Sequence, residues 1–233
     1  MADDTLIVLV ENDSESFAAG IDVTDGTNRW KIPRTKRANW STPVTMKDPA
    51  DGRTLVALQG SAGLDTIDPK SGQVVWSYTD GASTTPSSTV KGDVLYVPSN
   101  GLTALKLKGG GAFEQLWQQG NLRPGTASPV AAGDKVYVIT GAGVLNCANA
   151  KSGERLWRIR LDGPFRGSPV VAGDYLFGVS ERNGKAQLVD LRGDEGKVVG
   201  KFELGELVQC TPALSDGAVY VRSDSRIWKL AGS

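Results

Sequence analysis

A proline-centred motif recurs five times along the chain at almost constant spacing. It reads "STPV", "TTPS", "ASPV", "GSPV" and "CTPA", and successive prolines are 43, 43, 40 and 43 residues apart. The prolines are Pro43, Pro86, Pro129, Pro169 and Pro212. A fixed period of this size is typical of solenoids and propellers, in which one supersecondary unit is repeated. The repeat therefore constrains the fold more than any other feature of the sequence.

The same order of strand and turn signals follows each proline. A short apolar stretch leads to a Gly-Asp or Asp-Gly pair, as in "KGDVLYV", "AGDKVYV", "AGDYLFG" and "SDGAVYV". Such pairs between apolar stretches mark tight β-hairpins. Two further apolar stretches, such as "GVLNCAN" and "ERLWRI", complete the unit. Each unit is therefore predicted to form four short antiparallel strands.

Repeated four-stranded units predict an all-β propeller. A single sheet cannot bury both of its faces, whereas sheets repeated radially around an axis pack face to face. Linear stacking is the alternative solution. Units of 40 to 43 residues with four strands favour the radial arrangement, so the fold class is predicted as a β-propeller of four-stranded antiparallel blades.

A large aromatic residue follows the last turn of each of the first five units. The surrounding sequences include "DVTDGTNRW", "DPKSGQVVW" and "NAKSGERLW". A large ring at a fixed repeat position suits the groove between neighbouring sheets, where it buries extensive apolar area. The predicted blade-docking residues are Trp30, Trp76, Trp117, Trp157 and Phe202.

The sequence predicts six blade units within a single propeller domain that spans residues 1–233. Their approximate ranges are 1–37, 38–80, 81–121, 122–162, 163–205 and 206–233. The first unit lacks the proline-containing strand, and the last has three predicted strands. We expect the chain to form the C-terminal part of a propeller of seven or eight blades, with a six-unit arc that closes imperfectly as the alternative. Unpaired terminal strands would favour self-association.

The pattern "AxDxxxGxxxW", preceded by "SPVxxGDxVYV", resembles the pyrroloquinoline-quinone-like (PQQ-like) β-propeller repeat over essentially the whole chain. The resemblance is to non-catalytic, exported bacterial members of this family. The family also includes quinoprotein dehydrogenases, a lipoprotein of outer-membrane protein assembly and sensor domains attached to kinases. The resemblance implies a periplasmic or otherwise extracytoplasmic location. The first residues of this chain carry no signal-peptide pattern.

Composition argues against several classes of function. The chain has no histidine, which rules out His-based metal sites, Ser-His-Asp triads and c-type haem attachment. It has 26 basic and 26 acidic residues, whereas nucleic-acid binders usually carry a basic excess. No apolar stretch approaches the roughly 18 residues of a membrane-spanning helix. We therefore expect neither nucleic-acid binding nor membrane insertion.

Catalysis with a bound quinone is the alternative function, as a fragment or relative of a quinone-dependent oxidoreductase. In the family that this chain resembles, the quinone-dependent enzymes need a calcium site, a catalytic aspartate and, in many cases, two adjacent cysteines. The two cysteines, Cys147 and Cys210, are far apart in the sequence and are predicted to be buried free thiols, with a disulfide or a reactive thiol as the alternative. Conspicuous aspartates such as Asp68 lie in predicted turns, where aspartate is common. We therefore expect a non-enzymatic protein with no cofactor, metal or catalytic residue.

Loops between the fourth strand of one unit and the first strand of the next are expected to surround the central channel on one face. The candidate ligand-binding residues in these loops are Arg37, Trp40, Arg123, Phe165, Arg166 and Gln209. Three arginines on one face would favour an anionic ligand or an acidic peptide. The alternative is that they are solvated charges with local salt-bridge partners. The predicted function is a scaffold that binds a protein partner or a small anionic ligand; a sensor domain is a related possibility.

Overall fold

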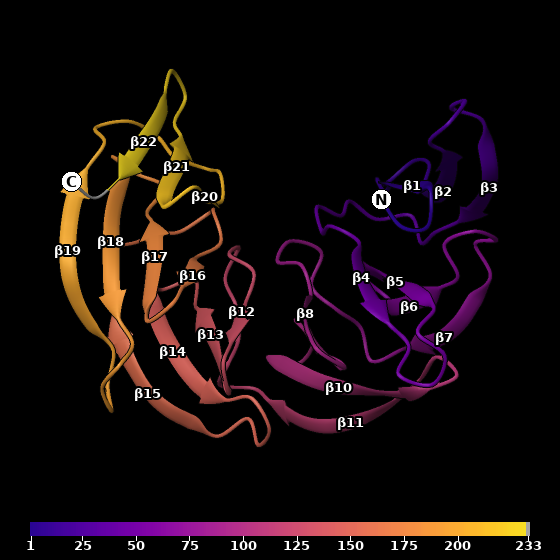
Figure 1. Ribbon diagram of the computed structural model, residues 1–233, viewed down its shortest axis with the longest axis horizontal. Helices are drawn as coiled ribbons and strands as arrows, with labels where there is room; N and C mark the ends of the chain where they lie inside the picture. Colours follow the sequence, from indigo (N-terminus) through magenta and orange to yellow (C-terminus); the bar gives the residue numbers. More distant parts are fainter. Residues whose placement is uncertain (232–233) are drawn as a thin grey trace. The chain divides into compact units, whose positions relative to one another are not determined.

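The computed structural model describes residues 1–231, which form 22 β-strands and no helix (Figure 1). The strands make six antiparallel sheets, four with four strands and two with three. In each sheet the strands follow one another in chain order, as hairpin-connected strands do. The predicted all-β propeller architecture, with repeated antiparallel blades, is confirmed.

The chain divides into two compact units, which we describe separately. Unit 1 covers Met1–Gly120 and holds three sheets, which we call A, B and C. Sheet A contains β1 (Thr5–Val10), β2 (Phe17–Asp22) and β3 (Asn28–Pro33). Sheet B contains β4 (Val44–Lys47), β5 (Thr54–Gly60), β6 (Gly63–Ile67) and β7 (Val74–Tyr78). Sheet C contains β8 (Thr89–Lys91), β9 (Val94–Val97), β10 (Leu102–Gly109) and β11 (Ala112–Gln119).

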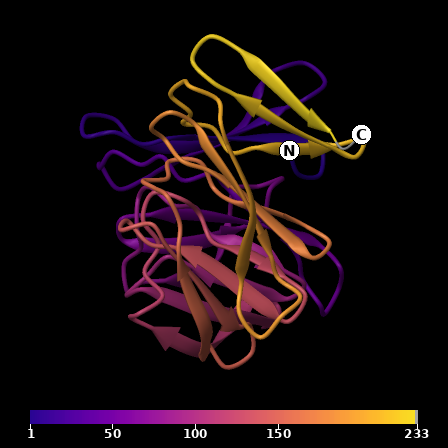
Figure 2. The ribbon, with the colours of Figure 1, turned by 90° about the vertical axis from the view of Figure 1, so that its left-hand side faces the viewer.

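Unit 2 begins at Asn121 and holds sheets D, E and F. Sheet D contains β12 (Val130–Ala132), β13 (Lys135–Ile139), β14 (Val144–Asn149) and β15 (Arg155–Arg160). Sheet E contains β16 (Val170–Ala172), β17 (Tyr175–Val179), β18 (Lys185–Asp190) and β19 (Lys197–Glu203). Sheet F, yellow in Figures 1 and 2, contains β20 (Ala213–Ser215), β21 (Ala218–Arg222) and β22 (Ile227–Ala231).

Local hydrogen bonds explain the repeated turn sequence before the fourth strands of sheets B and D. In the turn between β6 and β7, the Asp68 carboxylate accepts bonds from the backbone N–H groups of Lys70 (3.0 Å) and Ser71 (2.9 Å). The Gly72 N–H closes the turn onto the Asp68 carbonyl at 2.9 Å. An aspartate side chain that bonds to the backbone two and three residues ahead stabilises such a turn. The turn that follows Asn149 in sheet D repeats these bonds.

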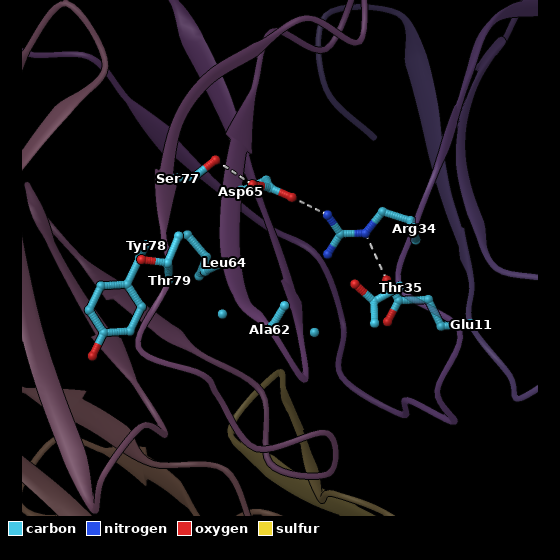
Figure 3. Close-up of a pocket in the computed structure, with 11 residues that line it drawn as sticks. Glu11, Arg34, Thr35, Ala62, Leu64, Asp65, Ser77, Tyr78 and Thr79 are labelled. Carbon is cyan, nitrogen blue, oxygen red and sulfur yellow. Dashed lines mark hydrogen bonds and ion pairs between the residues drawn. The ribbon is translucent and has the colours of Figure 1, made fainter.

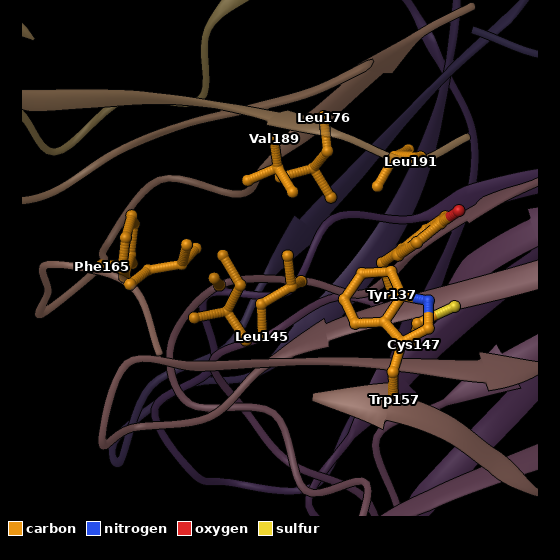
Figure 4. Packing of buried hydrophobic residues seen from close by; sticks show 11 residues of the cluster. Tyr137, Leu145, Cys147, Trp157, Phe165, Leu176, Val189 and Leu191 are labelled. Atoms are coloured by element: carbon orange, nitrogen blue, oxygen red, sulfur yellow. The ribbon is translucent and has the colours of Figure 1, made fainter. Parts of the chain in front are cut away.

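The hydrophobic core lies between neighbouring sheets. One buried cluster joins sheets D and E and includes Leu145, Trp157, Leu176 and Val189 (Figure 4). Similar clusters join sheets A and B, B and C, and E and F. Sheets B and E therefore bury both faces against their neighbours, as the blades of a propeller do.

Candidate functional site

The loop between β3 and β4 presents two of the predicted binding residues of unit 1. The side chain of Trp40 is 70% exposed, which is unusual for so large an apolar ring. Arg37 is also exposed and makes no ion pair within residues 1–231. The loop therefore offers an aromatic ring and a free guanidinium three residues apart.

Hydrogen bonds to neighbouring segments fix the backbone of this loop. The Trp40 N–H donates to the carbonyl oxygen of Thr84 at 2.7 Å. The Thr42 N–H donates to Ser87 Oγ at 2.9 Å, and the Ala38 N–H donates to Asp13 Oδ1 at 3.2 Å. Trp40 is thus an exposed side chain on a backbone that is anchored on both sides.

A buried charge network lies beneath the start of the loop (Figure 3). The side chain of Arg34 is 8% exposed, and its Nε donates to Glu11 Oε1 at 2.7 Å. Its Nη1 bonds to Asp65 of β6, and its Nη2 donates to the Leu58 carbonyl at 3.1 Å. Arg34 thereby ties sheet A to sheet B. Arg34 cannot be singled out from the sequence alone, because a run of basic residues does not reveal which of them is buried.

Asn39 connects the exposed part of the loop to the same network. Its Nδ2 donates to Glu11 Oε2 at 2.7 Å and to the carbonyl of Gln59 at 2.8 Å. Glu11, whose side chain is 3% exposed, therefore holds both Arg34 and Asn39. The loop that carries Trp40 is anchored through its side chains as well as its backbone.

A small cavity of about 130 Å³ adjoins this network. Its lining includes Thr35, Leu64, Ser77 and Tyr78, together with the charged groups. The Ser77 hydroxyl donates to Asp65 Oδ1 at 2.5 Å, and the other carboxylate oxygen of Asp65 is paired with Arg34. The arrangement is a closed set of ion pairs and hydrogen bonds, which makes it suited to holding the two sheets together.

In unit 2, Arg166 and Gln209 meet at one acidic side chain. Arg166 Nε donates to Glu181 Oε1 at 3.0 Å, and Gln209 Nε2 donates to the same oxygen at 3.2 Å. Arg166 therefore has the local salt-bridge partner that the alternative interpretation expected. Arg123 is exposed and makes no ion pair within the part of the chain that is described.

Phe165 differs from its expected role as exposed aromatic surface. Its side chain is only 6% exposed and belongs to the core cluster between sheets D and E (Figure 4). Its carbonyl accepts a 2.5 Å hydrogen bond from Thr126 Oγ1. The loop turns the apolar ring inward because burial removes it from water, so Phe165 offers no binding surface.

Two of the predicted docking tryptophans pack on a glycine of the following sheet. Trp30 of β3 lies against Gly72, where an added β-carbon would come within 2.5 Å of the indole ring. Its Nε1 also donates to the carbonyl of Pro69 at 2.8 Å. Trp157 of β15 lies against Gly196 in the same way, at 2.5 Å from an added β-carbon. Its buried Nε1 has no hydrogen-bond partner among residues 1–231.

The other two tryptophans pack against aromatic rings. Trp76 is half-buried, and its ring centroid lies 4.7 Å from that of Phe113 in sheet C. Trp117 is 7% exposed, and its ring lies 5.9 Å from that of Tyr96 in its own sheet. All four rings are therefore packed, although their surroundings differ.

Strand register shows that Phe202 does not occupy the tryptophan position. Rows of directly paired residues run across the second, third and fourth strands of each repeat. In sheets B to E, we call central the row whose second-strand member pairs with the first residue of the first strand, which is Val44, Thr89, Val130 or Val170. Sheet A lacks that first strand, and its central row is the one that contains Trp30. In sheets A to D the fourth-strand member is the tryptophan. The rows are Ile7–Gly20–Trp30, Ala57–Thr66–Trp76, Tyr96–Ala104–Trp117, Tyr137–Cys147–Trp157 and, in sheet E, Phe177–Leu188–Gly200.

Phe202 therefore lies two residues beyond the matching position. It is 41% exposed, and its ring centroid is 6.3 Å from that of Phe177. The turn between Asp190 and Gly196 is two residues longer than the turn between Asp68 and Gly72, but the spacing after the turn glycine is the same. Trp76 follows Gly72 by four residues, and Gly200 follows Gly196 by four. Phe202 matches the tryptophans in residue type but not in this spacing.

Neither cysteine forms a disulfide. Cys147 is fully buried, and burial raises the pKa of its thiol to about 11, so it stays protonated at neutral pH. Cys210 is only partly buried, which differs from the prediction that both thiols are buried. Its Sγ accepts a hydrogen bond from the Arg222 N–H at 3.3 Å.

Within residues 1–231, no three acidic or cysteine side chains gather as potential metal ligands. The sequence also has no adjacent pair of cysteines. Residues 1–231 likewise include no helix that could cross a membrane.

The six antiparallel sheets and the repeated sequence motifs define the class of protein as a β-propeller built from PQQ-like repeats. The sequence matches the family described as outer membrane protein assembly factor BamB over residues 1–90 and 102–185. The chain therefore belongs to this family. A comparison with curated protein sequences gave no match.

Three solved structures share the fold at low sequence identity. BamB from Moraxella catarrhalis has a TM-score of 0.77 and 18% identity, over 99% of this chain and 67% of that protein. A europium-containing methanol dehydrogenase has a TM-score of 0.70 and 14% identity, over 95% of this chain and 64% of the enzyme. BBS1N, solved in complex with ARL6DN and soaked with lead, has a TM-score of 0.68 and 14% identity, over 97% of this chain and 73% of that protein. Identities this low establish the fold alone.

Proposed function

We propose that this protein is a non-catalytic propeller scaffold that binds a protein partner through the β3–β4 loop, with Trp40 as the central contact and Arg37 beside it. The observation that carries the proposal is the 70% exposure of Trp40 on a backbone anchored at 2.7 Å to Thr84. Tryptophan and arginine are enriched among residues that dominate binding energy at protein interfaces. A preorganised loop also loses little conformational entropy on binding.

Family membership supports a role in outer-membrane protein assembly and an extracytoplasmic location. The family description names that process, and one structural relative is a BamB protein. In this proposal the partner is a component of the assembly machinery, and its contact segment carries an acidic residue near an apolar one. The free guanidinium of Arg37 favours the acidic residue.

Binding of a small anion is a weaker form of the same hypothesis. It would use Arg37 within unit 1 or Arg123 within unit 2, since Arg166 and Gln209 already share Glu181. A quinone-dependent oxidoreductase is the second candidate function, and the shared fold of the methanol dehydrogenase is its only support. The proposed function does not rely on either.

Site-specific photocrosslinking tests the scaffold proposal. A photoreactive phenylalanine analogue would replace Trp40 and, as the matched control, the exposed Leu214 of sheet F, which is 42% exposed. Expressed in a bacterium that contains the assembly machinery, the Trp40 variant should crosslink to one of its components, and Arg37→Glu should weaken that product. Equal crosslinking from both positions, or none from position 40, would contradict the proposal.

A further inference from the structure

The outer edge of sheet D is formed by β15, the fourth strand of its repeat. Among residues 1–231, no strand pairs with the outer side of β15 (Figure 1). The fourth strands of sheets A, B, C and E have the same free outer side. The free edge is therefore a property of the repeat and does not depend on either end of the chain. Its outward-pointing backbone N–H and C=O groups are available for pairing.

Strand register places three arginines of β15 on one face of the sheet. Arg155, Arg158 and Arg160 pair with alternate residues of β14, although a bulge interrupts β15 after Arg155. Alternate residues of a strand point to the same face and lie about 6.8 Å apart. We call these three residues the arginine row. The β14 partners of the row are Ala148, Asn146 and Val144.

The arginine row is exposed and has no acidic partner. All three of its residues are exposed, and none forms an ion pair with residues 1–231. Arg160 Nη1 donates to the carbonyl of Ala142 at 2.9 Å. Glu154 precedes the strand but makes no ion pair among the described residues, and Asp162 after it is paired with Lys201 at 3.0 Å. The row therefore keeps three positive charges that the chain does not balance locally.

The outer strands of the other sheets differ from β15 in their charge. Those of sheets A, C and E pair nearly all their charged side chains with a neighbouring group. Lys197 of β19 is the exception among the described residues, and β7 of sheet B has no charged residue. The pairs are Arg29–Asp22, Lys31–Glu15, Glu114–Lys108, Lys201–Asp162 and Glu203–Lys185.

Charge complementarity selects the kind of strand that the edge of β15 accepts. Opposite charges on directly paired residues stabilise neighbouring strands, whereas like charges destabilise them. A second copy of β15 would bring two arginine rows together and is disfavoured. A regular strand with acidic residues at alternate positions would place a carboxylate opposite each arginine, at the spacing that β14 has on the inner side. Charge-assisted hydrogen bonds between arginine and carboxylate are stronger than neutral ones.

We propose that the outer edge of β15 binds an extended acidic segment of a partner protein as an additional antiparallel strand. Acidic residues at alternate positions of this segment lie opposite Arg155, Arg158 and Arg160. Backbone hydrogen bonds supply affinity in such strand addition, and alternate side chains supply specificity. The site lies in unit 2, whereas the Trp40 loop lies in unit 1, so this inference does not rest on the proposed function.

A pair of synthetic peptides tests the spacing of the acidic residues. The first, STETETETS, has alternating glutamates, and the second, STTEEETTS, has the same composition with consecutive glutamates. Each is titrated into the full chain by calorimetry, and the backbone amides of β15 are followed by NMR. We expect the alternating peptide to bind about tenfold more tightly and to shift the amides of β15. Equal affinities, or no saturable binding up to about 1 mM, would overturn the proposal.

Charge reversal at the centre of the row provides a second test. Arg158→Glu should weaken binding of the alternating peptide about tenfold or more, and STETKTETS, with lysine at its centre, should recover this loss on the variant. Lys197→Glu is the matched control, because Lys197 is an exposed and unpaired basic residue of another outer strand. Similar losses from both substitutions, or no recovery with the lysine peptide, would contradict the assignment to the arginine row.

A third measurement separates strand addition from general attraction of anions. The alternating peptide with N-methyl groups on its internal amides keeps its charges but cannot form the backbone ladder, so it should not bind. If this peptide or polyphosphate bound as tightly, the row would be an anion surface and strand addition would be wrong. A dimer in sedimentation that the alternating peptide dissociates would place a second copy on the edge and also refute the proposal. Trp40→Ala should not affect peptide binding, which separates failure here from failure of the proposed function.

Discussion

The indole Nε1 of Trp30 donates a 2.8 Å hydrogen bond to the carbonyl oxygen of Pro69, although the two residues belong to different sheets. Trp30 lies on β3 of sheet A, and Pro69 lies in the turn between β6 and β7 of sheet B. The same turn places Gly72 against the indole ring. A single short motif therefore closes its own hairpin and binds the tryptophan of the preceding sheet.

Substitution of Gly72 by alanine should destabilise the protein more than the same change at Gly26. Both glycines have positive φ, 72° and 76°, so alanine costs about 1 kcal/mol at each. At Gly72 the new β-carbon would also lie within 2.5 Å of Trp30, whereas nothing lies within 4 Å at Gly26. We expect Gly72→Ala to cost about 1–3 kcal/mol more, measured by urea unfolding. Equal losses would show that the indole does not pack on this turn.

Replacement of tryptophan by phenylalanine should have different effects at Trp30 and Trp157. Trp30→Phe removes a buried hydrogen bond and leaves the Pro69 carbonyl without that donor, which costs about 1 kcal/mol beyond the lost packing. Trp157→Phe removes an N–H group that has no partner among residues 1–231. We therefore expect Trp157→Phe to be the milder change in urea unfolding. A larger loss at Trp157 would indicate that its N–H group is satisfied in solution.

The central row of sheet E should tolerate exchange of its large and small members. Gly200→Trp places an indole beside Leu188, whose Cβ already lies 3.5 Å from an added β-carbon. The double variant Leu188→Ala/Gly200→Trp recreates the Ala104–Trp117 pairing of sheet C. We expect it to be more stable than the sum of the single changes predicts, by about 1–3 kcal/mol. Strict additivity in a double-mutant cycle would argue against compensation within the row.

Asp48 should make the protein sensitive to acid. Burial opposes ionisation of this carboxylate, but hydrogen bonds from the backbone N–H groups of Ala50 (3.0 Å) and Gly111 (2.8 Å) outweigh it and lower the pKa below 3.8. A carboxylate with a lowered pKa stabilises the folded state above its unfolded pKa and loses this effect as the pH falls.

Asp48→Asn should therefore lower the melting temperature at pH 7. The difference in melting temperature between this variant and the unsubstituted protein should shrink as the pH falls below about 4. Asp51→Asn, in the same turn but exposed, serves as the control and should change little. A constant difference between Asp48→Asn and the unsubstituted protein across this pH range would contradict the assignment.

Trp40→Ala should leave the free energy of unfolding unchanged within about 0.5 kcal/mol, because the ring is 70% exposed. The contact with Thr84 uses the backbone N–H and survives the substitution. Urea unfolding checks this expectation. A loss above about 2 kcal/mol would mean that the ring is packed in solution and serves stability rather than binding.

The arrangement of strands could be predicted from the sequence because its signals are local. The proline period, the Gly-Asp hairpins and the Asp-x-x-Ser-Gly turns depend on the conformational preferences of neighbouring residues. Gly133 illustrates this: it adopts a φ of 57° between β12 and β13, where a β-carbon is disfavoured. Strand number and order follow from such turns.

The candidate site was harder to predict, because burial and pairing depend on residues distant in the sequence. The run Arg34–Arg37 reads as one basic stretch, yet Glu11 and Asp65 bury Arg34 while Arg37 stays exposed. Phe165 turns inward for a similar reason, since sheets D and E supply its apolar surroundings.

The sequence by itself determined that the chain folds as repeated four-stranded antiparallel sheets, because turns and apolar alternation act over a few residues. Only the tertiary structure decided which rings are packed and which charges are paired. It also established that Gly200, and not Phe202, takes the tryptophan position, because the pairing of β18 with β19 sets the register. Side-chain environments arise from contacts between sheets, and no local pattern encodes them.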